Sequence, residues 1–148
     1  MKLYRKTAHT VFDLKYHIVW TTKYRKPVLE GRLALRLRTL IREICDTYQI
    51  QIIRGHVSKD HVHIFISMPP QISVSKIAQY IKGKTSRKLL IENPSLNKKF
   101  WGQHLWARGY FAASSGAITD EAVMDYIAHQ DEDTEKRGDD FSILDMTS

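Results

Sequence analysis

The chain has 148 residues and a mass of 17.3 kDa, a size at which one compact domain can bury a core without disulfides or a structural metal. Lys and Arg number 23 against 16 Asp and Glu, and the resulting net charge of +7 favours nucleic acid as a partner. No apolar run approaches the length of a membrane-spanning helix, and the basic N-terminal segment lacks the apolar stretch of a secretory signal, so we expect a cytoplasmic protein with no membrane partner.

The first predicted elements are a strand and a basic helix. Between Asp13 and Thr21 apolar and polar residues alternate, which is typical of a half-buried strand. From Leu29 to Tyr48 apolar residues recur at helical spacing while arginines fill much of the remainder, which predicts a helix with a basic outer face. Cys45, the single cysteine, falls among the apolar positions of that helix, and we expect a buried, inert thiol there.

Two β-rich runs and a second helix follow. Residues 49–57 and 61–68 are joined by a short polar connection at 58–60 that suits a hairpin. Ser73 is suited to cap a helix that runs to about Ile91, with lysines and arginines on its outer face. The segment Glu92-Asn93-Pro94 is expected to end that helix.

The remaining predicted elements complete the order of strands and helices along the chain. Residues 100–106 are aromatic and irregular, residues 106–114 are predicted as a strand, and a last helix is expected at about 119–131, before an acidic, polar tail at 132–148. The first six elements match the split β-α-β of ferredoxin-like domains, in which two helices cover a four-stranded antiparallel sheet. We therefore predict a single α+β domain over residues 1–148, with the last helix as an addition.

Two histidines stand on one face of the predicted strand 61–68, because side chains alternate across a strand. His61 and His63 are then about 7 Å apart at the backbone, close enough to hold one metal ion together. Two ligands make an incomplete site, and polar residues on a solvated face would show the same alternation. The opposite face is apolar and is expected in the core: Val62, Ile64, Ile66 and Met68.

The last predicted helix carries a second pair. Tyr126 and Gln130 stand four residues apart, so a hydroxyl and an amide oxygen project from one helix face. A tyrosine on an amphipathic helix is ordinarily a core or edge residue. The combination of this pair with the histidine pair is much less common than either pair alone.

At these residues the chain resembles a known family. Asp60-His61-Val62-His63, followed by an apolar strand, resembles the histidine-hydrophobic-histidine motif of the HUH nucleases, and within them the small single-tyrosine transposases of bacterial and archaeal insertion sequences. The resemblance runs from about residue 13 to residue 130 in the family's order. Four further segments support it: Tyr16–Arg25 (YHIVWTTKYR), Phe100–Gly102 (FWG), Leu105–Phe111 (LWARGYF) and Tyr126–Gln130 (YIAHQ).

The resemblance implies a metal-assisted tyrosine enzyme. It assigns a divalent cation, Mg²⁺ or Mn²⁺, to His61, His63 and Gln130, where it would polarise the scissile phosphate. It assigns to Tyr126 the attack on phosphorus, which gives a 5′-phosphotyrosine link and a free 3′-hydroxyl, so that bond energy is retained for rejoining. No general base for this tyrosine is evident in the sequence.

The resemblance also implies the partners. The substrate would be single-stranded DNA bearing small hairpins, and a homodimer would share its active sites by exchanging the last helix, with Gly116 as a hinge. Basic residues with aromatic rings among them suit DNA binding. The expected DNA contacts are Lys23, Arg25, Lys26, Arg36, Lys82, Lys84 and Arg87.

Five polar residues near these motifs receive no catalytic role at this point. Asp60 is expected to be a turn residue outside the metal shell. His17 and His56 are interpreted as structural, because nothing in their spacing fixes the face of the sheet they occupy. Asp125 and His129 lie on different sides of the helix from Tyr126 and are interpreted as surface residues.

Two alternatives remain open. The same chemistry could belong to a domesticated nicking enzyme that acts on chromosomal repeat hairpins, or to the nicking domain of a replication or plasmid-transfer initiator, although such initiators usually carry further domains. A non-catalytic ferredoxin-like binder of single-stranded nucleic acid would need neither a metal nor Tyr126. Formation of a covalent protein-DNA adduct separates the enzymes from the binder.

Overall fold

The computed structural model describes residues 5–100, 104–114 and 120–130. The predicted acidic tail at 132–148 and the predicted hinge at Gly116 lie outside the described residues. Within the described residues, no helix is long and apolar enough to cross a lipid bilayer.

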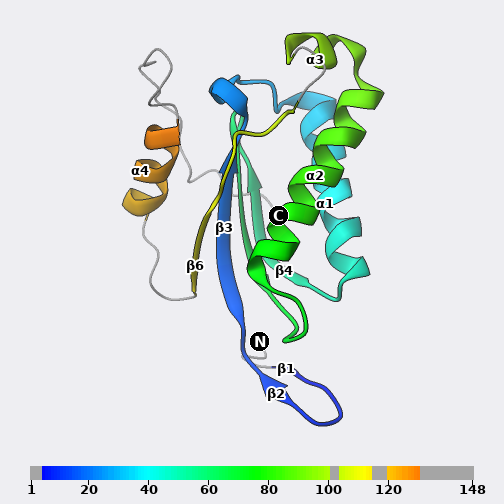
Figure 1. The fold of residues 1–148 in the computed structure, drawn as a ribbon, viewed down its shortest axis with the longest axis vertical. Coiled ribbons are helices and arrows are strands. Elements are labelled where there is room, and N and C mark those ends of the chain that lie inside the picture. The colour runs from blue at the N-terminus through cyan, green and yellow to red at the C-terminus, as the bar shows by residue number, and fades with distance from the viewer. Residues whose placement is uncertain (1–4, 101–103, 115–119, 131–148) are drawn as a thin grey trace.

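A four-stranded antiparallel sheet forms the centre of the fold (Figure 1). Its strands are β3 (Lys15–Thr21), β4 (Gln51–Val57), β5 (His61–Ser67) and β6 (Phe111–Ser114), in the spatial order β4-β5-β3-β6. β5 pairs with β3 and β4, and therefore lies between the two strands that α1 connects. This is the predicted split β-α-β arrangement, and the α+β, ferredoxin-like fold is confirmed.

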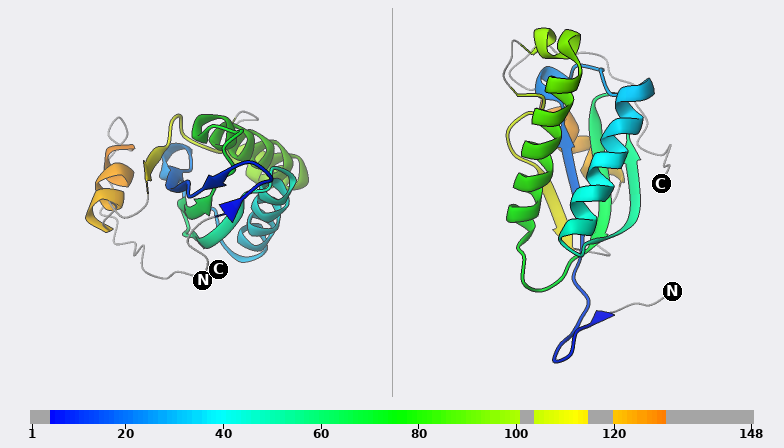
Figure 2. Two further views of the ribbon diagram at one scale, coloured as in Figure 1. Left: turned by 90° about the horizontal axis from the view of Figure 1, so that it is seen from below. Right: turned by 90° about the vertical axis from the view of Figure 1, so that its right-hand side faces the viewer.

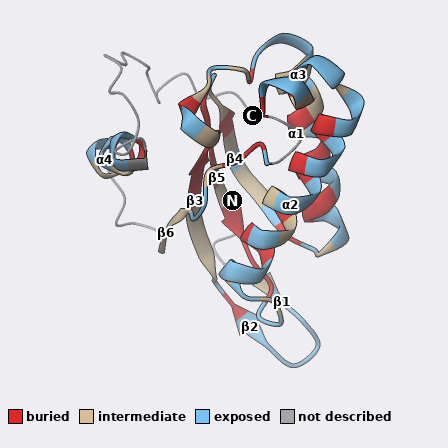
Figure 3. Ribbon diagram, turned by 45° about the horizontal axis from the view of Figure 1, so that its top comes forward, coloured by how far each residue is buried: buried red, intermediate tan, exposed pale blue. Residues whose placement is uncertain are grey.

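Two long helices lie side by side on one face of the sheet (Figure 2). They are α1 (Gly31–Thr47) and α2 (Val74–Glu92), and their apolar sides meet the inward side chains of β3 and β5, where the ribbon is mostly buried (Figure 3). All four aliphatic residues predicted for the core on and after β5 are at most 2% exposed. Cys45 is buried on the inner side of α1, as expected, and burial raises the pKa of its thiol to about 12, which disfavours the reactive thiolate.

α2 begins where it was predicted, and a further helix that was not predicted follows its end. Ser73 caps α2, because its hydroxyl accepts a hydrogen bond from the backbone N–H of Lys76 at 3.1 Å. α2 ends at Glu92, as expected, but Pro94 then begins a further short helix, α3 (Pro94–Lys99). Proline ends one helix and is also favoured in the first turn of the next, where its missing N–H costs nothing.

A small hairpin precedes the sheet and was not predicted. Its strands β1 (Arg5–Lys6) and β2 (Val11–Phe12) have two residues each, too few to show an alternating pattern. The Arg5 guanidinium ties it to the sheet by donating to the carbonyls of Ser67 at 3.1 Å and Gln49 at 2.9 Å.

The strand predicted at 106–114 was too long. Only Phe111–Ser114 pairs along β3, whereas Trp106 makes a single isolated bridge to Thr22. The reason is a tie to α2: the Lys82 ammonium donates to the carbonyls of Ala107 at 2.9 Å and Gly109 at 2.6 Å. Those carbonyls consequently face a helix rather than a neighbouring strand.

The last helix, α4 (Asp120–Gln130), lies on the opposite side of the sheet from α1 and α2 (Figures 1 and 2). Val123 and Ile127 of α4 are fully buried against Val19 of β3, and the partly buried rings of Phe111 and Tyr126 pack on this cluster. The predicted C-terminal helix is thus confirmed, with its apolar side on the sheet.

Candidate active site

Strand pairing places a row of four side chains across the sheet. His56 of β4 is paired with His63 of β5, His63 with Val19 of β3, and Val19 with Phe111 of β6. Directly paired residues project from the same face of a sheet. Because Val62 and its alternate neighbours fill the core beneath the helices, the row lies on the face that α4 approaches.

The two histidines of the predicted motif are buried on that face. His61 is 0% exposed and His63 is 8% exposed, so the alternative that they are polar residues on a solvated face is wrong for both. Buried polar side chains are retained where they have partners or a chemical role.

Two further histidines join them, although their spacing had indicated no more than a structural role. His17 of β3 places Nδ1 3.0 Å from Nε2 of His63, and its ring stacks on Phe65 with centroids 4.2 Å apart. The ring of His56 lies 6.2 Å from that of His61, and its Nε2 is 2.7 Å from the Ser58 hydroxyl. Four imidazoles therefore form a cluster that the sequence does not reveal, since it requires the pairing of three strands.

Burial and mutual repulsion keep part of this cluster neutral. Burial, which has the largest effect, together with the neighbouring histidines and Arg54, lowers the pKa of His63 to about 4. Burial and then Arg54 also lower the pKa of His17. His63 is therefore neutral at neutral pH, which is the form of imidazole that binds metal ions.

Asp60, at the turn before β5, lies between the side chains of His61 and Arg25. Its Oδ1 is 2.9 Å from Nδ1 of His61, and its Oδ2 accepts a hydrogen bond from Nε of Arg25 at 3.2 Å. Burial alone would raise the pKa of this carboxyl, but the hydrogen bond with His61, the charge that His61 carries when it is protonated, and the hydrogen bond and charge of Arg25 outweigh burial and lower it. Asp60 is thus an ionised, buried carboxylate as well as the expected turn residue.

The predicted nucleophile lies at the β6 edge of the same face. The Tyr126 ring packs against Phe111 with centroids 5.7 Å apart, and its buried hydroxyl has no hydrogen-bond partner among the described residues. Burial raises the pKa of this phenol above its ordinary value of 10. β3 separates β6 from the histidine strand β5, so α4 lies beside the histidine pair rather than over it.

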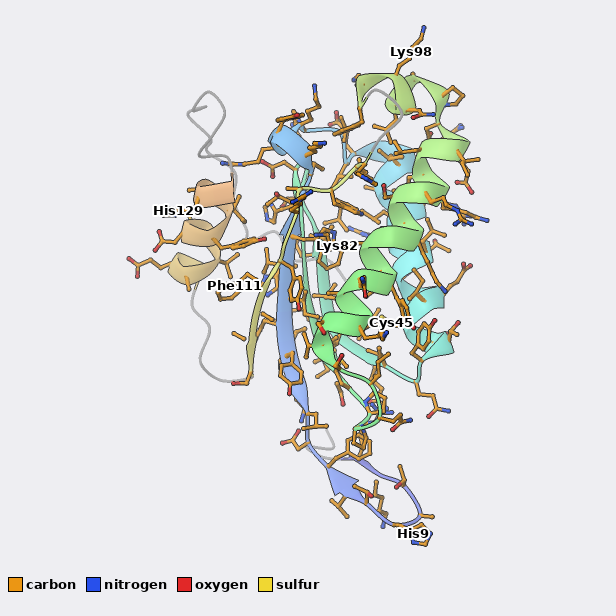
Figure 4. All side chains as sticks on the ribbon, viewed as in Figure 1. His9, Cys45, Lys82, Lys98, Phe111 and His129 are labelled. Carbon is orange, nitrogen blue, oxygen red and sulfur yellow. The ribbon has the colours of Figure 1, made fainter. Side chains whose placement is uncertain are left out.

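Other side chains of α4 play no visible part in the site. The Gln130 side chain lies outside the described residues. Asp125 and His129 are exposed, and Nδ1 of His129 is 2.7 Å from the Asp125 carbonyl, in agreement with surface positions (Figure 4).

The histidine pair fits two ligand positions of a divalent cation. His61 has Nδ1 engaged by a carboxylate, an arrangement common among metal-binding histidines. His63 has Nε2 engaged by His17, while its Nδ1 is buried with no hydrogen-bond partner in the described part of the chain. Over residues 5–100, 104–114 and 120–130, no three His, Cys, Asp or Glu side chains are placed to hold a metal ion together.

Several known proteins are similar to this chain over most of its length. The family model described as "Transposase IS200 like" matches residues 10–130. A transposase for insertion sequence element IS200 from Salmonella typhimurium is 34% identical over 139 residues, covering 94% of this chain and 90% of that protein. The ISDra2 transposase TnpA from Deinococcus radiodurans is 32% identical over 126 residues, covering 85% of this chain and 90% of that protein.

The chain belongs to the IS200-like transposase family. It is therefore a DNA-cleaving enzyme of transposition, and the sequence resemblance is confirmed at the level of the family. Among solved structures, a candidate transposase from Deinococcus radiodurans R1 has a TM-score of 0.79 at 28% identity, covering 85% of this chain and 97% of that one. A REP-associated tyrosine transposase bound to a REP hairpin shares the fold at a TM-score of 0.53 and 15% identity, and the match covers 87% of this chain and 68% of that one.

The basic residues of this transposase are not equivalent in the structure. Lys84 and Arg87 are exposed on α2, and Lys23 and Lys26 are partly exposed in and after the short 3₁₀ turn η1 (Lys23–Arg25). Arg36 forms a bidentate ion pair with Glu92 at 3.0 Å.

Two of the residues predicted to contact DNA are hydrogen-bonded to the protein itself. Lys82 is hydrogen-bonded to backbone carbonyls, as described above. Arg25 is 5% exposed and faces Asp60, so its inward position matches the predicted DNA contact poorly. The sequence gives no local signal for this, because the partner of Arg25 is 35 residues away.

Proposed function

We propose that this transposase cleaves and rejoins single-stranded DNA at insertion-sequence ends through a covalent link to Tyr126. The observation that carries the proposal is the pairing of a buried histidine pair on β5 with a tyrosine helix docked on the same face of the sheet. A merely structural sheet face would not combine buried imidazoles with a tyrosine hydroxyl that lacks a partner among the described residues.

In the proposed step, the Tyr126 oxygen forms a bond to phosphorus while the bond from phosphorus to the 3′-oxygen breaks. The phenol loses its proton and the departing 3′-oxygen gains one, so the step needs no external reductant, oxidant or nucleotide. The reverse attack by a 3′-hydroxyl restores the phosphodiester and releases Tyr126. Burial raises the pKa of Tyr126 where it packs on Phe111, so we expect the hydroxyl to leave that apolar contact before attack.

His61, His63 and Gln130 would hold the divalent cation. Such an ion would supply positive charge to the scissile phosphate and stabilise the charge that develops in the transition state. Imidazole ligands favour Mn²⁺, whereas cellular abundance favours Mg²⁺. The protein's own contribution is a neutral His63 held in place by His17, and a His61 held by Asp60.

The DNA would be single-stranded and folded into hairpins, and the relative of the same fold is bound to a REP hairpin. Lys23, Lys26, Arg36, Lys84 and Arg87 would contact phosphates. An open groove runs between α2 and the segment before β6, and basic side chains give it a charge that suits a nucleic-acid backbone. The groove is lined in part by Lys82, Arg87, His104 and Arg108.

A covalent adduct tests the proposal. The protein is incubated with a single-stranded hairpin oligonucleotide and Mn²⁺ or Mg²⁺, and adducts are resolved on a denaturing gel. Tyr126→Phe should abolish the adduct, whereas the matched control Tyr80→Phe, on α2, should retain it. His61→Ala should lose cleavage and keep DNA binding. An adduct that survives Tyr126→Phe would show that another residue is the nucleophile.

The same assay addresses the alternatives. Identity of 34% over most of the chain to a transposase for IS200 favours insertion-sequence ends over chromosomal repeat hairpins as the substrate. A non-catalytic binder would bind the hairpin and give no adduct with either metal.

A further inference from the structure

The turn η1 that carries Arg25 has an unusual backbone. Tyr24 and Arg25 have φ values of 58° and 51°, in the left-handed region that costs a residue with a Cβ about 1–2 kcal/mol. The turn is held on both sides: Lys23 N–H donates to the Leu105 carbonyl at 2.8 Å, and the Thr22 hydroxyl donates to the Lys26 carbonyl at 2.9 Å. Two consecutive strained residues indicate that the direction of the Arg25 side chain matters.

That direction is inward, onto Asp60. The Arg25 side chain is 5% exposed, and its Nε donates to Oδ2 of Asp60 at 3.2 Å. Burying a guanidinium is unfavourable unless it is paired and hydrogen-bonded. The Arg25–Asp60 contact thus forms despite the cost of a strained backbone and of a desolvated guanidinium.

The other oxygen of the same carboxylate meets the first histidine of the motif. Oδ1 of Asp60 is 2.9 Å from Nδ1 of His61, whose side chain is fully buried. A carboxylate accepts hydrogen bonds and cannot donate them once ionised, so this contact requires a proton on Nδ1 of His61. In the neutral imidazole the lone pair then resides on Nε2.

We infer that Asp60 and Arg25 are positioning residues: Asp60 holds His61 in the tautomer that presents the Nε2 lone pair, and Arg25 holds Asp60 in place. This inference rests on the proposed function insofar as His61 serves as a metal ligand. It gives Arg25 a role in the interior in place of the predicted DNA contact, and it gives the turn residue Asp60 a role beyond the turn.

The wild-type protein alone provides the first test. Nitrogen-15 NMR of the metal-free protein distinguishes the two histidine tautomers, and His61 should carry its proton on Nδ1. A His61 protonated only on Nε2 would overturn the inference, whatever the outcome of the adduct assay. Loss of the adduct with the expected tautomer would instead overturn the proposed function and leave the Asp60 contact intact.

Substitutions provide the second test, with Mn²⁺ binding followed by electron paramagnetic resonance. Asp60→Asn and Arg25→Met should each weaken Mn²⁺ binding, by roughly 10- to 100-fold for Asp60→Asn, because such supporting contacts contribute that much to metal affinity. Affinity for a hairpin oligonucleotide without metal should change by less than about twofold. The matched control Arg32→Met, at an exposed position near the start of α1, should leave both Mn²⁺ binding and hairpin affinity unchanged.

Two outcomes would contradict the inference. Unchanged Mn²⁺ affinity in a folded Asp60→Asn protein would show that Asp60 does not support His61. A loss of hairpin affinity in Arg25→Met, with Mn²⁺ affinity unchanged, would return Arg25 to the DNA interface. If either variant fails to fold, the wild-type tautomer still decides the role of Asp60.

Discussion

His63 illustrates how a buried imidazole links the site to stability. The unfolded chain takes up a proton on this residue near pH 6.5, whereas the native protein does so near pH 4. Between these values acid favours unfolding, so the contribution of neutral His63 is fully present above about pH 6.5 and is lost as the pH falls toward 4. The lowered pKa of His17 acts in the same direction.

We therefore predict that the metal-free protein loses free energy of unfolding between pH 6.5 and 4, on the order of 3 kcal/mol from His63. Urea denaturation in EDTA, repeated across this range, measures the slope, and His63→Gln should flatten it. His9→Gln, in the exposed loop of the N-terminal hairpin, should leave the slope unchanged. An equally steep slope in His63→Gln would assign the acid sensitivity to other groups.

Some residues of the site could be predicted from the sequence because strand geometry is local. Alternation along 61–68 correctly separated the core residues from His61 and His63, and helical spacing placed Tyr126 on its helix. The positions of His17 and His56 depended on strand register, which the spacing did not determine. The inward turn of Arg25 depended on left-handed backbone and on a partner distant in sequence, and neither leaves a local pattern.

At the scale of elements, α2 positions the segment that leads into β6. The Lys82 ammonium reaches two carbonyls of that segment, the Thr85 hydroxyl accepts from Nε1 of Trp106 at 2.9 Å, and the Ser86 hydroxyl accepts from the Leu105 N–H at 3.0 Å. Partial burial lowers the pKa of Lys82 to about 8. Figure 4 shows Lys82 on α2 at the side that faces the sheet.

We predict that Lys82→Met loosens this segment, because two hydrogen bonds from a charged donor are lost. Amide hydrogen exchange measured by mass spectrometry should become at least severalfold faster in peptides covering 105–110. Lys88→Met, on an exposed position of the same helix, should leave exchange there unchanged. Unchanged exchange in Lys82→Met, together with weaker hairpin binding, would mean that Lys82 contacts DNA rather than the chain.

Length decided which elements could be predicted. The sheet strands β3, β4 and β5 and the helices α1, α2 and α4 each span enough residues to show their period, and their ends were correct to within about two residues. The six-residue α3 and the two-residue strands β1 and β2 are too short for that. The segment before β6 follows tertiary hydrogen bonds from Lys82, which no periodicity expresses.

At the scale of the whole molecule, the position of α4 bears on the sharing of active sites between two subunits, which the family resemblance implies. Within one chain, α4 docks on its own sheet through Val19 and Phe111, and this contact buries the Tyr126 hydroxyl and raises its pKa. An apolar contact that disfavours the phenolate is a poor environment for a nucleophile. The arrangement therefore supports the proposal that α4 moves before attack, and a partner subunit's histidine pair is one place for it to dock.

Mixed dimers test whether Tyr126 acts on the partner. We predict that Tyr126→Phe and His63→Ala, each inactive alone, restore adduct formation when co-expressed and purified as a heterodimer by two different affinity tags. In that heterodimer, exchange of α4 unites the intact tyrosine of one subunit with the intact histidine pair of the other. If each active site were built within a single subunit, one site would lack Tyr126 and the other would lack His63, and no adduct would form. An inactive heterodimer would therefore contradict the exchange of α4. A heterodimer carrying both substitutions in one subunit serves as the control, because it keeps a complete site only if each subunit uses its own helix.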